Sequence, residues 1–329
     1  MAEVFDVLFL LALPGSGKSE VRNYLTHKDP VHFHMGPTAQ LDDYPYVHLQ
    51  LVVDQILGEL GMPQVYHWAD PDDGGNGPFI DPRELGGLCE LLNEDYFELV
   101  SGQPDRPKHA AKRLLDRFDA ASIRAGGRPK FRTLPPGIRE ALEEKLEPEA
   151  RKLFDEKAAN VPESMDGKTV VIEFARGGPA GSTFPLTGGY GYQASLAHMS
   201  PEILKRAAIL YIWVTPEESR RKNDARAKKG EQGSILFHRT PTVVMMREYG
   251  ICDMHHLLET SDKPGTIRVE SHGYVFNVPT EPFDNRTDLT SFLRAPVDEW
   301  SEADINKIHG SLSEASGRLW KSYSGSREG

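Results

Sequence analysis

Residues 12–19 read Ala-Leu-Pro-Gly-Ser-Gly-Lys-Ser, between an apolar run at 4–11 and a segment with helical spacing. The apolar run predicts a buried strand. Val21, Tyr24 and Leu25, at i, i+3 and i+4, predict that a helix with one apolar face follows the turn. A glycine-rich turn between a strand and a helix N-terminus is typical of sites that bind nucleotide phosphates.

Each residue type in this turn has a separate chemical use. Gly15 and Gly17 let the backbone curl until successive N–H groups point at phosphate oxygens, and the following helix adds the partial positive charge of its N-terminus. Lys18 is expected to bridge the outer phosphates, and Ser19 offers a hydroxyl to Mg²⁺. The predicted nucleotide-binding residues are Pro14, Gly15, Ser16, Gly17, Lys18, Ser19 and Glu20.

The turn matches the P-loop, or Walker A, pattern G-x-x-x-x-G-K-[ST] except at its first position, where Ala12 replaces glycine. The alternative is a strand-turn-helix corner that contains Gly-Lys-Ser by chance. The upstream strand, the second glycine and the downstream helix are independent requirements, and together they favour the nucleotide site.

The composition is that of an ordinary soluble globular protein of one or two domains, with 329 residues, 39% hydrophobic and 26% charged. The apolar stretch near the N-terminus is not expected to be a signal peptide, because Glu3 and Asp6 stand where a basic leader would be. With only Cys89 and Cys252, no disulfide framework is implied, and a reducing, cytoplasmic location is predicted.

The charge balance of the chain restricts the partners that it is expected to bind. Asp and Glu number 49 against 38 Lys and Arg, a net charge of -11 that repels a polyanion unless basic residues gather on one face. No run approaches the roughly 20 apolar residues that a membrane span requires. The predicted partners are a nucleotide and a small-molecule acceptor, with nucleic acid and membrane disfavoured and a homodimer left open.

Strand and helix patterns alternate along much of the chain. Strands are predicted at 31–35, 169–174 and 207–214, with a strand pair at 266–270 and 274–278. Helices are predicted at 49–60, throughout 81–160, and after the caps Ser200 and Thr215, with a long loop at 61–80. This alternation favours a mostly parallel sheet with ligands at the carboxyl ends of its strands.

The resulting domain prediction is a discontinuous α/β core, 1–60 and 165–290, interrupted by a mainly helical insertion, 61–164. The remainder, 291–329, is predicted as a C-terminal helix followed by a disordered tail from Ser322.

A phosphate site of this kind needs an acid for the metal at the end of a neighbouring strand. Glu173 follows four apolar or β-branched residues and precedes a glycine-rich stretch, so it is predicted to organise Mg²⁺ together with Ser19. Arg176 is expected to point into the same crevice. The alternative is a surface ion pair between Glu173 and Arg176.

Asp42 and Asp43 are predicted to lie at the carboxyl end of the second strand. There, either carboxylate could act as a general base or a hydrogen-bond acceptor for an alcohol. The alternative, an acidic loop that caps the next helix, has equal support.

A basic cluster begins just after the strand at 207–214 and includes Arg220, Arg221 and Arg226. These guanidinium groups could fold over the phosphates as a lid, stabilising transferred charge and excluding water. The alternative is a solvated helix face on which Arg220 pairs with Asp224.

The loop 177–191, with six glycines, Tyr190 and the adjoining Tyr192, could be a mobile substrate clamp or a long connection. His32 with His34, and Asp253 with His255 and His256, lack the third element of a transition-metal site. Cys252 is not expected to be a nucleophile, because no cause of a lowered pKa is visible.

Taken together, these motifs resemble the nucleoside and nucleotide kinase-like branch of P-loop proteins, which includes polynucleotide kinases and small-metabolite kinases. The matching residues are 14–19, Asp42-Asp43-Tyr44, Glu173 with Arg176, and 214–221 as the start of a lid. The stretch 173–223 also resembles bacterial proteins to which no activity can be attached. The resemblance implies an α/β fold with a five-stranded parallel sheet flanked by helices, a large helical insertion, and ATP and Mg²⁺ as cofactors.

The leading hypothesis is a kinase that transfers the γ-phosphoryl group of ATP to a small hydroxylated acceptor, most plausibly a nucleoside or nucleotide. The catalytic residues would be Lys18, Asp42, Asp43, Glu173, Arg176, Arg220, Arg221 and Arg226. Two alternatives are a P-loop ATPase or nucleotide switch that acts on a protein partner, and a kinase for a polynucleotide or modified base.

Overall fold

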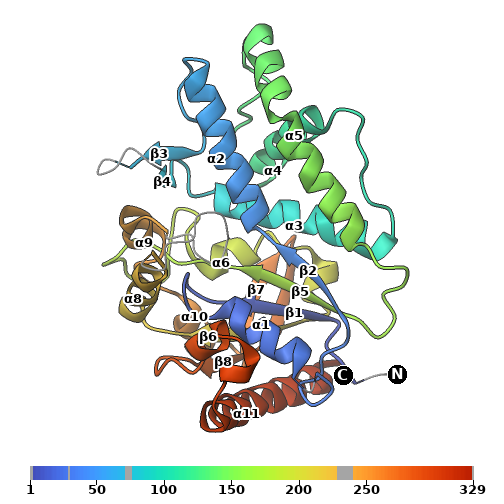
Figure 1. Ribbon diagram of the computed structural model, residues 1–329, viewed down its shortest axis with the longest axis vertical. Coiled ribbons are helices and arrows are strands. Elements are labelled where there is room, and N and C mark those ends of the chain that lie inside the picture. The colour runs from blue at the N-terminus through green and yellow to red at the C-terminus, as the bar shows by residue number, and fades with distance from the viewer. Residues whose placement is uncertain (1–2, 29, 71–75, 228–239, 328–329) are drawn as a thin grey trace.

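A six-stranded, mostly parallel sheet lies at the centre of the computed structural model, which describes residues 3–28, 30–70, 76–227 and 240–327 (Figure 1). In spatial order the strands are β2 (Thr38–Asp42), β5 (Thr169–Phe174), β1 (Val7–Leu11), β6 (Ala207–Trp213), β8 (Tyr274–Asp284) and β7 (Thr266–Ser271). Five strands run parallel, and β7 adds an antiparallel edge through its hairpin with β8. The predicted strands at 169–174 and 207–214 and the predicted strand pair are confirmed, but the sheet has six strands rather than five.

Helices cover both faces of the sheet, because successive side chains of its buried strands point to opposite sides. Phe9, Ile172 and Ile209 belong to one apolar cluster, and Leu8 and Val171 belong to another on the opposite face. The first cluster is covered by α3 (Glu84–Ser101), α6 (Gly191–Leu196), α7 (Pro201–Leu204) and α10 (Met254–Glu259). The second is covered by α1 (Lys18–His27) and α11 (Glu302–Arg327). The core is thus a three-layer α/β/α arrangement.

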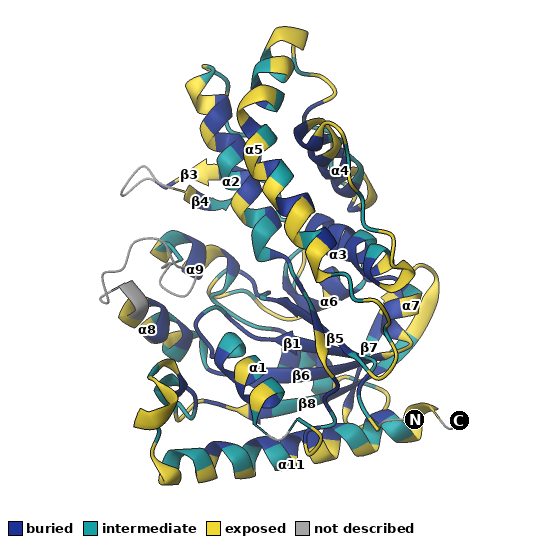
Figure 2. Cartoon of the chain, turned by 45° about the vertical axis from the view of Figure 1, so that its right-hand side comes forward, coloured by how far each residue is buried: buried dark blue, intermediate teal, exposed yellow. Residues whose placement is uncertain are grey.

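A helical lobe above the sheet is built from α2 (Tyr44–Glu59), α4 (Ala110–Arg124) and α5 (Pro136–Asn160) together with α3 (Figure 2). Because α2 packs in this lobe, the lobe begins before residue 61, where the insertion was predicted to start. Its own apolar cluster includes Leu49, Val53 and Leu57 of α2 beside Leu114 and Leu146 of the later helices. The α3 helix is buried on both sides, since its residues belong to this cluster and to the cluster on the sheet. The insertion is therefore packed directly onto the core.

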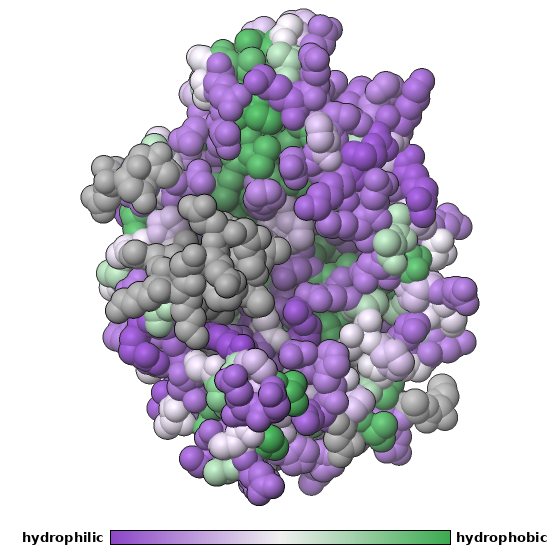
Figure 3. Space-filling view, in the orientation of Figure 1, coloured by the Kyte–Doolittle hydropathy of each residue, from purple (hydrophilic) through white to green (hydrophobic). Residues whose placement is uncertain are grey.

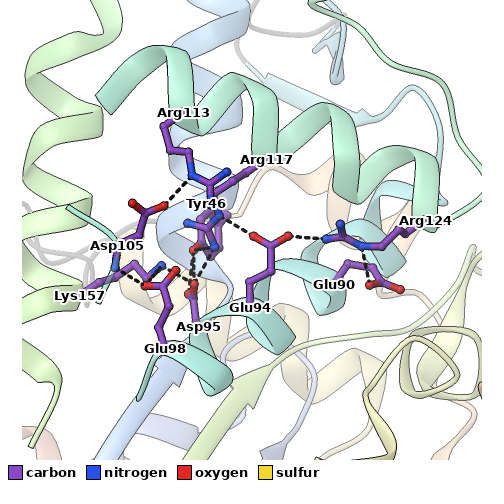
Figure 4. Close-up of polar contacts among 10 residues, drawn as sticks. All are labelled: Tyr46, Glu90, Glu94, Asp95, Glu98, Asp105, Arg113, Arg117, Arg124 and Lys157. Atoms are coloured by element: carbon purple, nitrogen blue, oxygen red, sulfur yellow. Dashed lines mark hydrogen bonds and ion pairs between the residues drawn. The ribbon is translucent and has the colours of Figure 1, made fainter. Parts of the chain in front are cut away.

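A buried polar network joins the four helices of the lobe (Figure 4). At its centre, Arg117 donates from Nη2 to Asp95 Oδ1 (2.8 Å) and from Nε to Glu94 Oε2 (2.6 Å). The Tyr46 hydroxyl donates to the same Asp95, and Lys157 Nζ lies 2.5 Å from Asp95 Oδ1. Tyr46 stands at the start of α2, so this network fixes the helix that begins directly after Asp42 and Asp43.

The predicted second strand at 31–35 is wrong, because the strand lies at β2 instead. Residues 31–35 form turns, with the Met35 N–H donating back to the Pro30 carbonyl (2.9 Å). Phe33 and Met35 are buried in the cluster beneath α1 and α11. Their apolar character reflects packing against a helix from the far end of the chain.

The segment 61–80 is not only loop, because it contains the antiparallel pair β3 (His67–Ala69) and β4 (Asn76–Phe79). The pair starts where the Asp54 carboxylate on α2 accepts from the N–H groups of Val65, Tyr66 and His67. This tertiary contact sets the direction of the chain, and the local composition of Gly, Pro and Asp does not reveal it.

The tail predicted to be disordered from Ser322 is instead helical through Arg327, as the end of α11. The hydroxyl of Tyr323 accepts from the Asp6 N–H (3.1 Å), and Arg327 Nη2 lies 2.9 Å from Asp6 Oδ2. Contacts with the N-terminal segment thus extend the helix. None of the described helices is both long and apolar enough to cross a membrane.

Candidate functional site

A cavity of about 750 Å³ opens at the carboxyl ends of β1, β2 and β5. Its floor is the turn 13–19, and its walls come from Asp42, Asp43 and Glu173 at the strand ends, from α2 and α3 of the insertion, and from α9 (Thr242–Glu248). The described residues of this cavity include Pro14 to Ser19 of the predicted nucleotide-binding set, but not Glu20.

The turn has the backbone geometry that its glycines permit. Gly15 and Gly17 take φ values of +75° and +96°, in the left-handed region that L side chains rarely adopt. A Cβ on Gly17 would lie 2.4 Å from Thr290 Oγ1. Both positions therefore require glycine in this structure.

Two residues from distant parts of the chain hold the turn in place. The Ser219 hydroxyl, on α8 (Pro216–Ala227), donates to the Pro14 carbonyl (2.6 Å). The fully buried Asn285 donates from Nδ2 to the Ser16 carbonyl (2.8 Å) and to Thr290 Oγ1 (2.8 Å). The carbonyls of the turn are thus anchored away from the cavity.

The donors of the turn are left available. Within the described chain, the N–H groups of Gly15, Gly17, Lys18 and Ser19 donate to no protein acceptor, and the Ser19 hydroxyl makes no hydrogen bond. Burial lowers the pKa of Lys18, although Glu173, Asp42 and Asp43 each act in the opposite direction. Glu20 turns away from the cavity and pairs with Arg294. The arrangement is a cradle of backbone N–H donors with one ammonium, a geometry that suits an anion.

Asp42 and Glu173 stand side by side, because they are register partners on the parallel strands β2 and β5. Burial raises the pKa of Asp42 to about 7, with Asp43 and Glu173 adding repulsion. Asp42 Oδ1 also accepts from the Tyr44 N–H (2.8 Å) at the start of α2. The Asp42 carboxylate therefore contacts the first residue of α2, as the alternative of an acidic loop beside this helix supposed. The same carboxylate also lines the cavity.

The ion pairs differ from those expected. Glu173 Oε1 pairs with Arg22 Nη1 at 2.7 Å, so the predicted alternative of a surface pair between Glu173 and Arg176 is wrong. Arg176 instead pairs with Asp43, Nη1 to Oδ2, at 2.7 Å, and the guanidinium is buried.

All five N–H groups of the Arg176 guanidinium are used inside the protein. The acceptors are Ser195 Oγ for Nε (2.8 Å), Asp43 Oδ2 (2.7 Å) and the Ala175 carbonyl (2.6 Å) for Nη1, and the Leu85 carbonyl (2.9 Å) and Cys89 Sγ (3.6 Å) for Nη2. A guanidinium has no further donors to offer. Arg176 therefore positions Asp43. It lines the same cavity as Glu173, as expected, but its donors are all paired within the protein.

Arg220 and Arg221 of the basic cluster on α8 do not line the described cavity, as residues of the predicted lid would. Arg220 pairs with Glu217 (3.1 Å) and Arg221 with Glu218 (2.6 Å), one turn earlier on the same helix. Neither lines the described cavity, and the predicted pair of Arg220 with Asp224 is replaced by the pair with Glu217. The side chain of Arg226 and the residues 228–239 lie outside the described part of the chain.

The loop 177–191 is packed at its ends, where Gly177, Gly178 and Gly191 are buried, whereas most of residues 180–188 are exposed. Gly177 and Gly178 lie against residue Ile251, and a Cβ on Gly177 would be 2.5 Å from the Ile251 carbonyl. Tyr192 is buried in the sheet cluster and Tyr190 packs on the insertion cluster, so neither lines the cavity. These contacts agree with the alternative that the loop is a long connection between elements.

Among the described residues, no group of three or more His, Cys, Asp and Glu is placed to hold a metal. His255 packs on Trp213.

Burial raises the pKa of Cys252 to about 12. A thiol with this pKa stays protonated at neutral pH and is a poor nucleophile.

Sequence reasoning missed Glu248, the last residue of α9. Its carboxylate is buried, lines the cavity and accepts from the Phe79 N–H (2.6 Å). Burial raises the pKa of Glu248 to about 7. The local sequence carries no signal for this residue, because only the fold of α9 against β4 brings it to the site.

Comparison of the chain with protein-family models, with curated proteins and with solved structures finds no match. The functional argument therefore depends on the geometry of the site.

Proposed function

We propose that the protein is a P-loop kinase that transfers the γ-phosphoryl group of ATP to a small hydroxylated acceptor. The observation that carries the proposal is the meeting of three features in one cavity: the unpaired amides of the turn, the Lys18 ammonium, and the carboxylates Asp42 and Glu173. Amides and ammonium suit phosphate oxygens, and carboxylates suit a divalent cation.

The position of the turn in the sheet supports the same proposal. β1 lies between β5 and β6, with β2 beyond on one side and β8 on the other. The turn after β1 is thus at the point where the strand order diverges, where ligands bind in open α/β sheets.

The residues present fit Mg²⁺ bound together with phosphates. Ser19 and Glu173 are oxygen donors at one edge of the sheet, and Asp42 stands beside Glu173 as its register partner. Mg²⁺ is usually held by one or two protein oxygens and by substrate phosphates, so a larger ligand cluster is not required. When bound, Mg²⁺ would neutralise charge on the phosphates.

Asp42 and Asp43 would divide the work on the acceptor. Asp43 is fixed by Arg176, whereas Asp42, with a pKa near 7, can accept the proton of an acceptor hydroxyl. In the balanced step, the bond from the γ-phosphorus to the bridging oxygen breaks, a bond to the acceptor oxygen forms, ADP leaves, and the proton passes to Asp42 and then to solvent.

The apolar side of the cavity supports transfer to an acceptor over simple hydrolysis. Val47, Leu51 and Val52 of α2 and Leu88 of α3 line it, next to the carboxylates. Such a wall binds the carbon skeleton of an acceptor and excludes water, and a hydrolase for ATP alone does not need it.

The test is Lys18→Ala, with Lys28→Ala at the other end of α1 as the matched control. The protein is incubated with Mg²⁺, ATP labelled in the γ-phosphate and a pool of nucleosides, sugars and polyols, and labelled products are identified. We expect transfer by wild type and Lys28→Ala and none by Lys18→Ala, with the circular dichroism spectrum unchanged. A folded Lys18→Ala variant with full activity would exclude the proposal, and hydrolysis without any labelled acceptor would favour an ATPase.

A further inference from the structure

The charges around the cavity restrict the kind of acceptor that fits it. Among the described lining residues, four are carboxylates, Asp42, Asp43, Glu173 and Glu248, and two carry a fixed positive charge, Lys18 and Arg176. Lys18 belongs to the phosphate turn, and every N–H of Arg176 has a protein acceptor. Apart from the histidines His48 and His67, of which His67 pairs with Asp54, the described acceptor side has no cationic side chain left for a phosphate group.

The rest of the acceptor side is apolar or neutral. Val47, Leu51 and Val52 come from α2 and Phe79 from β4, and Figure 3 shows apolar residues gathered beside α2 on the upper lobe. The polar lining groups beyond them include carboxamides, Gln55, Gln64 and Asn76. Carboxamides donate and accept hydrogen bonds without charge, so they suit the edge of a neutral ring.

Glu248 adds a carboxyl group at this wall, and because burial raises its pKa to about 7, this group carries its full negative charge only above neutral pH. One of its oxygens accepts from the Phe79 N–H, and within the described chain the other oxygen accepts from no group. A carboxylate in this place accepts a hydrogen bond from a hydroxyl or amino group, and it repels a phosphate.

On the basis of the proposed function, we propose that the acceptor is an unphosphorylated alcohol with an apolar or ring-shaped body, such as a nucleoside, and that Glu248 selects it against the corresponding monophosphate. The carboxylate would bind a donor group of the acceptor while Asp42 faces the hydroxyl that is phosphorylated. Glu248 is thus a specificity residue and takes no part in the chemical step.

The first experiment compares matched pairs. Each of the four ribonucleosides, together with sugars and aromatic alcohols, is offered with labelled Mg-ATP beside its own monophosphate, and binding of Mg-ATP is measured separately by calorimetry. We expect that free alcohols are phosphorylated with kcat/KM on the order of 10-fold or more above the monophosphates. A preference for a monophosphate, or no transfer to any free alcohol by protein that binds Mg-ATP, would overturn the inference. Failure to bind Mg-ATP would instead remove the proposed function itself.

The second experiment uses Glu248→Gln, which keeps an oxygen to accept the Phe79 N–H. We expect the KM for the preferred alcohol to rise on the order of 10-fold, with kcat and the Kd of Mg-ATP unchanged, and the discrimination against the monophosphate to fall. Glu281→Gln, on β8 and outside the cavity lining, is the control. An unchanged KM and unchanged discrimination in a variant with wild-type melting temperature would show that Glu248 does not select the acceptor.

Discussion

Replacing Arg176 with methionine tests whether this guanidinium supports the structure or binds phosphate. The substitution removes the partner of the buried Asp43 carboxylate and leaves the Leu85 carbonyl and Ser195 hydroxyl without their donor. Breaking a buried ion pair from one side costs about 3–5 kcal/mol, and each orphaned neutral group adds about 1–3 kcal/mol before relaxation. Because such terms overlap, we expect the free energy of unfolding to fall by about 5 kcal/mol, a large share of the roughly 5–15 kcal/mol typical of a domain.

The assay is urea unfolding followed by the fluorescence of the four tryptophans. Arg220→Met is the matched control, since its exposed pair with Glu217 should contribute less than about 1 kcal/mol. Adding Asp43→Asn to Arg176→Met should recover about 2 kcal/mol, because it removes the uncompensated charge. A loss below about 1 kcal/mol, together with a Kd for Mg-ATP at least roughly tenfold weaker, would refute the positioning role and assign Arg176 to phosphate binding.

Three further predictions concern the turn and the carboxylates. The folded-state pKa of Asp42, about 7, exceeds its ordinary value of 3.8. The native state therefore binds this proton more tightly than the unfolded state does. The free energy of unfolding that this proton contributes is lost as the pH rises from about 4 to 7. Asp42→Asn should therefore melt at a higher temperature than wild type above pH 7 and show no advantage near pH 4; an advantage independent of pH would contradict the account. Binding of Mg-ATP near pH 7 should release protons from Asp42. Calorimetry in buffers of different ionisation enthalpy measures this release. Neither Asp42→Asn nor the wild type in EDTA should show the same release. Asn285→Ala should lower stability by about 2 kcal/mol and weaken Mg-ATP binding by loosening the turn at Ser16, whereas Asn23→Ala on the exposed side of α1 should do neither; equal behaviour of the two variants would count against the anchoring role.

Local sequence carried enough information to predict the turn and the strand-end acids. Glycines with positive φ, a lysine and a serine at fixed spacing, and a β-branched run ending in Glu173 are determined within a few residues. The α2 helix and the strands at 169–174 and 207–214 were predictable for the same reason, because period and burial agree there.

The misses all depend on contacts between distant segments. Phe33 and Met35 looked like a strand but are buried in the cluster that α1 and α11 cover. Ser322 and the residues after it looked disordered, but the contacts of Asp6 with Tyr323 and Arg327 keep them helical. Spacing along the chain contains no information about partners as distant as Phe33 and Ser316, 283 positions apart, or Asp6 and Tyr323, 317 positions apart.

The same reason explains the parts of the site that sequence reasoning placed incorrectly or missed. Arg176 was predicted to point into the crevice as a catalytic residue, yet the packing of α3 supplies the Leu85 carbonyl and holds the guanidinium against Asp43. Glu248 follows a segment of the chain that carries no motif, and it reaches the cavity only because α9 packs on β4.

The chain leaves the sheet at the end of β2 and returns to it at β5, and these two strands are neighbours. The excursion between them can therefore lengthen, shorten or be exchanged without altering the register of any strand pair. In an evolving lineage, or in a laboratory chimera, the cavity walls formed by α2, α3 and β4 could be replaced together while the turn after β1 stays intact. Such a chimera would have to preserve the buried hydrogen bonds of Arg176 to Asp43 and to the Leu85 carbonyl.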